Sequence, residues 1–221
     1  EVVPGVVETL RIVTRRASER IAAFAFDRAR HEGRRRITLV HKASIMKKSD
    51  GLFLDSCRRV ARDFPFIECD EMQIDTAAMQ LVLDPGRFDT LVMENLFGDL
   101  ISDLCAGLVG GLGVVPGANI GDRCAVFEAV HGSAPDIAGR GVANPTALIL
   151  SSAMMLQHIG ERQAADRITR AVESVLAERA CVTRDLGGTA GTREMGDAVI
   201  AAIGSIPSSH APVGLPQSAP S

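Results

Sequence analysis

The chain has 221 residues, enough to bury a substantial hydrophobic core in one or two domains. Its formal net charge of −3 gives no global attraction to nucleic acid, and no apolar run reaches the roughly 18 residues of a membrane helix, so neither partner is expected. Five scattered cysteines without a CxxC pair indicate reduced thiols in a reducing compartment, which favours the cytoplasm.

In the first half of the chain, short β-rich runs alternate with segments of helical apolar spacing. Ser18 is the expected N-cap of the first helix, Gly33 its end, and Asp50 the expected cap of the second helix. The expected strands span 6–13, 36–40, 66–69 and 90–93, and the expected helices span 18–30, 50–61 and 73–83, with one more directly after residue 93. This alternation predicts βαβ units and a mostly parallel sheet, the α/β class.

In the second half of the chain, the regular alternation of strand and helix patterns gives way to glycine-rich segments. A glycine-rich loop is predicted at 110–123, a strand at 125–130 and a second loop at 131–144. Pro145 fits the first position of an apolar helix that runs to about residue 158. An amphipathic helix at 161–179 and a last helix at 193–203 follow. The Pro/Ser/Ala-rich tail is predicted to be disordered.

Asp99 and Asp103 lie four residues apart in ENLFGDLISD, so both carboxylates would face one side of a helix. Two carboxylates held there repel each other without a cation between them. Oxygen ligands suit a hard ion such as Mg²⁺ or Mn²⁺. Asp75 is a possible third ligand. Taken alone, the pair has a simpler interpretation, because Asp99 can also stabilise a helix N-terminus by its charge.

Lys42 and the segment HGSAPDI (131–137) also follow predicted strands. In open α/β sheets, binding sites form beyond the carboxyl ends of strands. A partly desolvated lysine there could act as a general acid or base, although a solvated surface lysine fits the local sequence too. The turn amides of 131–137 suit an adenosine or phosphate group, and an ordinary turn is the alternative. No GxGxxG or GxxxxGK[ST] motif occurs.

Four strings together resemble the β-decarboxylating dehydrogenases, the family that includes isocitrate and 3-isopropylmalate dehydrogenases. They are HKASIMKKSDGLF, ENLFGDLISDLCAGLVGGLGVVPGANIG, FEAVHGSAPDIAG and ANPTALILSSAMML. The opening VVPGVVETLRIVTRRASERIAAFAF and the tripeptide HKA are similar to the NAD-dependent isocitrate branch, whereas the isopropylmalate branch usually has DKANVL. The resemblance implies an isocitrate/isopropylmalate dehydrogenase-like α/β fold. Its parts would be a small domain with the dimer interface at 1–109, the C-terminal part of a large NAD-binding domain at 110–206, and a disordered tail at 207–221.

The resemblance also assigns roles to the candidate residues. Asp99, Asp103 and Asp75 match metal ligands, and Lys42 matches the family's catalytic lysine. Lys42 and Asp75 would reach into the active site of the partner, so that a homodimer shares each site. The matching cofactor-binding positions are His131, Gly132, Ser133, Ala134, Asp136, Ile137 and Asn144. An acidic residue at 136 can accept from a ribose 2′-OH, which favours NAD, whereas NADP-dependent members typically have Lys-Tyr at 136–137.

The implied reaction is metal-dependent oxidative decarboxylation of isocitrate to 2-oxoglutarate, with reduction of NAD. The hydroxyl loses a proton as hydride leaves, and the resulting β-keto acid loses CO₂ while a Lys–Tyr acid pair delivers a proton. Homoisocitrate and 3-isopropylmalate are alternative substrates. A non-catalytic subunit or fragment is the alternative from a different class.

Several positions depart from the family's pattern. The family's catalytic Tyr, and the Ser, Asn and Arg that grip the substrate, lie upstream of Glu1, and this chain contains no Tyr. We therefore expect the chain alone to be inactive. Ser44 stands where the family usually has Asn, and Glu94 and Phe97 replace the Pro and Tyr of many isocitrate enzymes.

Overall fold

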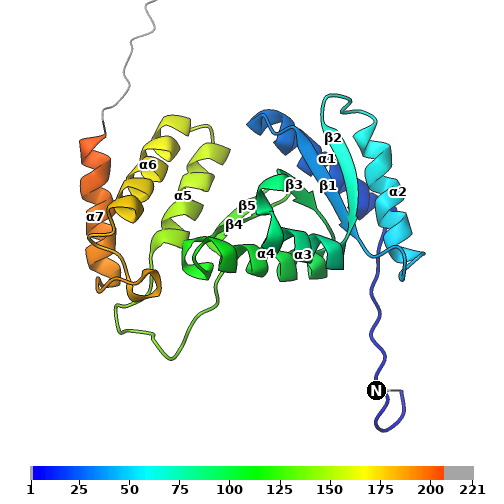
Figure 1. The fold of residues 1–221 in the computed structure, drawn as a ribbon, viewed down its shortest axis with the longest axis horizontal. Helices are drawn as coiled ribbons and strands as arrows, with labels where there is room; N and C mark the ends of the chain where they lie inside the picture. Colours follow the sequence, from blue (N-terminus) through cyan, green and yellow to red (C-terminus); the bar gives the residue numbers. More distant parts are fainter. Residues whose placement is uncertain (1, 207–221) are drawn as a thin grey trace, which may run out of the picture. The chain divides into compact units, whose positions relative to one another are not determined.

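The computed structural model describes residues 2–206, and the tail predicted at 207–221 lies outside the described residues. The chain divides into two compact units, Glu1–Leu108 and Val109–Ser221, and each is described by itself (Figure 1). Among the described helices, none combines the length and apolar character required to cross a membrane.

The first unit is built on a three-stranded parallel sheet in the order β2–β1–β3. The strands are β1 (Arg36–His41), β2 (Glu68–Gln73) and β3 (Thr90–Val92). Residues 37–40 of β1 are buried, as expected for a central parallel strand covered on both faces. His41 pairs with Gln73, so the chain leaves β1 and β2 at the same edge of the sheet.

Four helices accompany this sheet: α1 (Arg15–Glu32), α2 (Ser49–Ala61), α3 (Ile74–Leu83) and α4 (Asn95–Val109). Helices α1 and α2 pack together, and their apolar faces meet the sheet in one buried cluster. Its larger members are Phe26, Ile37, Leu39, Phe53, Leu54 and Val92. Burying a side chain of this size contributes roughly 1.5–3 kcal/mol. The parallel sheet and the α/β class are confirmed.

Helix α1 starts earlier than predicted. Thr14, not Ser18, is its N-cap, and Thr14 Oγ1 accepts a hydrogen bond from the Ala17 backbone amide at 3.2 Å. Ser18 is buried one turn into the helix, where its hydroxyl donates to the Thr14 carbonyl at 2.9 Å. The predicted end is confirmed, because Gly33 adopts the left-handed conformation (φ 69°) that closes many helices.

The strand predicted at 6–13 is wrong. Residues 7–14 have no regular structure, and the side chains of Val7, Leu10 and Ile12 are exposed. A β-rich sequence forms a strand only where a neighbour takes up its backbone hydrogen bonds, and none of the described strands pairs with this segment. The strand predicted at 66–69 is displaced as well, since β2 starts at Glu68, opposite the start of β1.

The second unit contains the hairpin β4 (Pro116–Ile120) and β5 (Ala125–Ala129), and the helices α5 (Thr146–His158), α6 (Arg162–Glu178) and α7 (Thr192–Ser205). Helix α5 packs on the hairpin and on α6, which packs on α7. A second buried cluster forms around Val172, Met195 and Val199. Single 3₁₀ turns lie at Pro85–Arg87 in the first unit and at Leu112–Val114 and Arg184–Leu186 in this one.

Two predictions for the second unit need correction. Residues 116–120, predicted as loop, form an antiparallel strand, and a Cβ at Gly117 would lie 3.1 Å from the Glu128 carbonyl oxygen. Glycine here permits a close approach of the two backbones rather than a loop. Pro145 is the N-cap of α5 rather than its first residue, and the helix begins at Thr146.

Candidate active site

Lys42 and Asp75 form an ion pair at the carboxyl edge of the parallel sheet. The Lys42 Nζ lies 2.7 Å from an Asp75 carboxylate oxygen. The register explains the pair, since Lys42 follows β1 directly and Asp75 lies in the first turn of α3, which continues from β2. The lysine side chain is 23% exposed and the aspartate side chain 65% exposed. A partly desolvated ammonium group therefore lies beside an accessible carboxylate, an arrangement suited to proton transfer.

The same contact lowers the pKa of Asp75. The hydrogen bond from Lys42 is the largest cause, and backbone amides at the start of α3 add to it. Asp75 is therefore ionised throughout the neutral range, the form required to bind a cation.

We expect the Lys42→Met variant of this chain to raise the Asp75 pKa toward its ordinary value. The folded pKa is depressed, so the contribution of this pair to stability is present at neutral pH and is lost as pH falls through that pKa. An NMR titration of the Asp75 carboxyl carbon would measure the change. Lys47→Met, at an exposed lysine of the same loop, is the control. An equal Asp75 pKa in both variants would contradict this assignment.

Asp99 and Asp103 lie on one side of α4, and both residues are exposed. Within residues 2–206, neither carboxylate is engaged in a hydrogen bond or ion pair; the Ser102 hydroxyl donates to the backbone carbonyl of Asp99. Their oxygens are thus free to bind, and two unpaired carboxylates fit a hard divalent cation. However, no group of three acidic, His or Cys side chains in the described part of the chain is placed to hold a metal ion. One chain does not bring Asp75 together with Asp99 and Asp103.

The helices that carry these aspartates also expose apolar side chains. On α4, Leu96 and Leu100 are more than half exposed beside the Asp99/Asp103 pair. On α3, Met79, Val82 and Leu83 are half exposed or more. Exposed apolar groups concentrated on neighbouring helix turns are typical of a protein interface.

In the second unit, the predicted cofactor loop borders a cavity of about 900 Å³. Six of the seven predicted residues line it: His131, Gly132, Ser133, Ala134, Ile137 and Asn144. Asp136 is exposed and is not part of the wall. Arg184, Asp185 and Thr192 also line the cavity, and none of these three was predicted from the sequence. The cavity lies within the usual size range of small-molecule binding sites.

Hydrogen bonds from distant parts of the chain hold this loop. The Asn144 side-chain amide donates to Asp185 at 2.8 Å, and its oxygen accepts from the Thr146 backbone amide at 2.9 Å. At the start of α7, the Thr192 amide donates to the Gly141 carbonyl at 2.8 Å. Ala134 has a left-handed φ of 43°, which is uncommon for a residue with a side chain. Contacts within the chain therefore define the shape of this loop.

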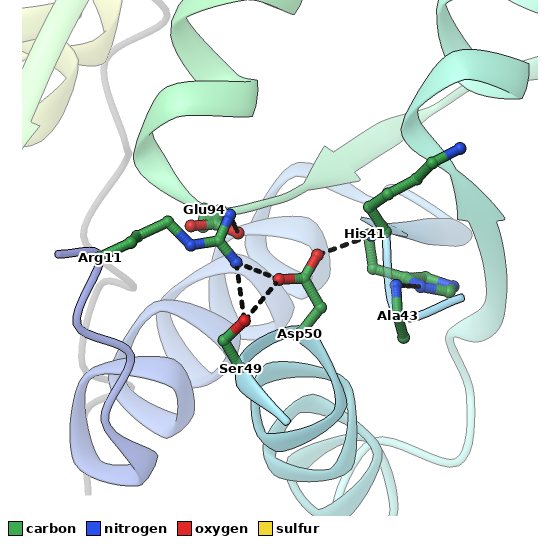
Figure 2. Close-up of polar contacts among 7 residues, drawn as sticks. Arg11, His41, Ala43, Ser49, Asp50 and Glu94 are labelled. Carbon is green, nitrogen blue, oxygen red and sulfur yellow. Dashed lines mark hydrogen bonds and ion pairs between the residues drawn. The ribbon is translucent and has the colours of Figure 1, made fainter. Parts of the chain in front are cut away.

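Arg11, Asp50 and Glu94 form a second charged cluster, which contacts the backbone of Lys42 through Asp50. Figure 2 shows Arg11 between the carboxylates of Asp50 and Glu94. Asp50 does not cap α2 as predicted, because Lys48 occupies the N-cap position and the Asp50 carboxylate is directed elsewhere. It accepts from the Lys42 backbone amide at 2.7 Å and from the Arg11 guanidinium. Burial is the largest cause of a raised pKa of Glu94.

Comparison with known proteins identifies the class of protein to which this fold belongs. The crystal structure of isocitrate dehydrogenase from Methylococcus capsulatus superposes with a TM-score of 0.86 at 54% identity, over 89% of this chain and 58% of that one. The 3-isopropylmalate dehydrogenase of Archaeoglobus fulgidus is 54% identical over 194 residues, which is 88% of this chain and 59% of the relative. The fold is that of the β-decarboxylating dehydrogenases.

A profile of the isocitrate/isopropylmalate dehydrogenase family matches residues 4–199, and the chain belongs to this family. A mitochondrial regulatory subunit of NAD isocitrate dehydrogenase from Dictyostelium discoideum is 53% identical over 199 residues, 90% of this chain and 56% of that protein. The chain thus spans less than three-fifths of the length of each of these relatives.

Proposed function

We propose that this chain is part of an enzyme that converts isocitrate to 2-oxoglutarate and CO₂ while reducing NAD. The observation that carries the proposal is the Lys42–Asp75 pair at the carboxyl edge of the sheet. The HKA tripeptide at 41–43 favours the isocitrate branch over the isopropylmalate branch. Five free cysteines are consistent with a cytoplasmic location, which we also propose.

Asp99 and Asp103, completed by Asp75, would hold Mg²⁺ or Mn²⁺. A bound divalent ion polarises the substrate hydroxyl and stabilises the negative charge that develops as CO₂ leaves. Lys42 keeps a proton at Nζ, next to Asp75, and donates it toward the substrate. Asp75 holds the lysine side chain in place through their 2.7 Å contact.

The cavity bordered by 131–144 is the proposed NAD site. The backbone amides and small side chains of Gly132, Ser133 and Ala134 allow close approach of a nucleotide, and Asn144 offers a fixed amide. Asp136 lies just outside the cavity wall, exposed on the same loop, where a ribose hydroxyl could reach it. Its negative charge would repel a 2′-phosphate.

We further propose a homodimer with shared active sites, in which the first unit is the small domain. Lys42 and Asp75 of one copy would meet Asp99 and Asp103 of the other. Two observations support this. The described residues of one copy assemble no three-ligand group, and helices α3 and α4, which carry the aspartates, also expose apolar side chains.

The test uses the extended enzyme, by which we mean this chain joined to the tyrosine-bearing upstream segment that the family resemblance implies. Isocitrate, homoisocitrate and 3-isopropylmalate are each assayed with NAD and Mg²⁺. We expect the highest kcat/KM with isocitrate. Turnover of 3-isopropylmalate without turnover of isocitrate would overturn the substrate assignment.

Replacing Asp136-Ile137 by Lys-Tyr is expected to shift the cofactor preference of the extended enzyme toward NADP. The substitution removes the negative charge at 136 and supplies a positive charge for the 2′-phosphate. We expect the ratio of kcat/KM with NADP to kcat/KM with NAD to rise by about 10–100-fold. Steady-state kinetics with both cofactors would measure it. An unaltered NAD/NADP ratio would show that 136–137 does not contact the ribose.

A non-catalytic subunit is the second candidate function. The 53% identity to a regulatory subunit of an NAD isocitrate dehydrogenase favours it. Turnover of the parent extended enzyme and of its Lys42→Met variant distinguishes the two candidate functions. Loss of turnover in Lys42→Met supports the catalytic function, and turnover that is absent already in the parent supports the non-catalytic one.

A further inference from the structure

Asp50 restrains the backbone of Lys42. Its carboxylate is only 1% exposed, and its Oδ2 accepts from the Lys42 backbone N–H at 2.7 Å. The other oxygen accepts from Arg11 and from the Ser49 hydroxyl (Figure 2). A buried carboxylate forms short, charge-assisted hydrogen bonds. Lys42 is therefore fixed at both ends, at its backbone by Asp50 and at its Nζ by Asp75.

Arg11 extends this restraint to the helix of the metal-ligand pair. One guanidinium nitrogen of Arg11 lies 2.8 Å from Glu94, and another donates to Ser49 at 3.2 Å. Glu94 directly precedes α4, and its carbonyl accepts from the Gly98 amide at 2.8 Å. The cation thus neutralises two carboxylates from different segments, the start of α2 and the start of α4. Without Arg11, the buried carboxylate of Asp50 and the partly buried carboxylate of Glu94 would repel each other.

We propose that Asp50 is a positioning residue for Lys42, and that Arg11 couples it through Glu94 to the start of α4. This inference rests on the proposed function, in which Lys42 transfers a proton. Asp50 contacts neither substrate nor cofactor in this account. Its loss should therefore lower kcat and leave the KM values for isocitrate and NAD nearly unchanged, because substrate binding does not depend on where the lysine amine lies.

The test compares Asp50→Asn with Asp55→Asn in the extended enzyme. Asparagine keeps an acceptor for the Lys42 amide but loses the charge, and we expect kcat to fall by about 10–100-fold. Asp55 lies on the same helix with its carboxylate 67% exposed, and its variant should retain the parent kcat. Amide hydrogen exchange provides a readout without activity: Lys42 N–H should exchange at least about tenfold faster in Asp50→Asn, while Leu39 in β1 is unchanged.

The outcomes separate this inference from the function on which it rests. If Lys42→Met abolishes turnover but Asp50→Asn keeps the parent kcat, the positioning role is wrong and the function stands. If Lys42→Met retains full turnover, Lys42 is not the proton donor and the positioning role loses its premise, whatever Asp50 does. If the parent extended enzyme does not turn over isocitrate with NAD, the proposed function itself fails. Should Asp50→Asn not fold, Arg11→Lys and Arg11→Gln replace it. The lysine variant is expected to keep most of the parent kcat and the glutamine variant to lose it, and equal values in both would overturn the proposal.

Discussion

Replacing Lys42 by methionine is expected to lower kcat of the extended enzyme by about 10²–10⁴-fold, the usual contribution of a general acid or base. Methionine has nearly the same length and shape, so the substitution removes the ammonium group and its contact with Asp75 while leaving the packing in place. Steady-state kinetics with isocitrate and NAD would measure the loss. Circular dichroism and thermal unfolding would establish that the variant is folded.

Lys47→Met is the matched control for this prediction. Lys47 lies on the same loop, and it is exposed. Its variant should retain the parent kcat. A Lys42→Met enzyme that is folded and as active as Lys47→Met would remove Lys42 from the mechanism.

Replacing Asp103 by asparagine is expected to weaken Mn²⁺ binding by about 10–100-fold, and activity at a fixed metal concentration should fall with it. Asparagine keeps one oxygen in place but removes the negative charge that a divalent cation requires. Because the Asp103 carboxylate is exposed and has no partner within residues 2–206, the fold should tolerate the change. Titration calorimetry of the extended enzyme with Mn²⁺ would measure the dissociation constant.

Asp122→Asn is the control for the metal prediction, since Asp122 is an exposed aspartate in the turn between β4 and β5. Its Mn²⁺ affinity should equal that of the parent. If Asp103→Asn also leaves both the Mn²⁺ affinity and the Mg²⁺ dependence of activity unaltered, the pair on α4 is not a metal site.

Local sequence patterns were sufficient to predict those helices and strands that depend on interactions between residues close together in the chain. The buried run 37–40, the helix over α3 and the closure of α1 at Gly33 were predicted because periodicity and left-handed glycine have local causes. Local patterns gave wrong predictions where pairing with a distant segment determines whether a strand forms. Residues 6–13 have β propensity but no pairing strand among the described residues, whereas 116–120 looks like a glycine loop and pairs with β5.

Some parts of the candidate site could likewise be predicted from local sequence, and others could not. Lys42 could be predicted because it follows a strand of the parallel sheet, and α/β sheets place their ligands at the carboxyl ends of such strands. The 131–137 loop was selected by the same rule, but it follows β5, which belongs to an antiparallel hairpin, so the rule does not account for it. The positioning contacts could not be found, since Asp50 resembled an N-cap and nothing local connects it to Arg11, 39 residues away in sequence. Asp185 was missed for the same reason, because its contact with Asn144 spans 41 residues. Side-chain contacts between distant segments leave no periodic pattern in the chain.

Mixing two inactive variants tests most directly whether two copies of this chain share each active site, as we propose. Extended enzymes carrying Lys42→Met or Asp103→Asn are unfolded together, refolded and assayed with isocitrate, NAD and Mg²⁺. In a mixed dimer, one site would combine an intact Lys42 with an intact Asp103, and the other would carry both substitutions. We predict recovery of about a quarter of the parent activity, because half of the dimers are mixed and each has one working site. If Lys42 and Asp103 instead act within one chain, every site keeps one defect, and the mixture would stay as inactive as its components.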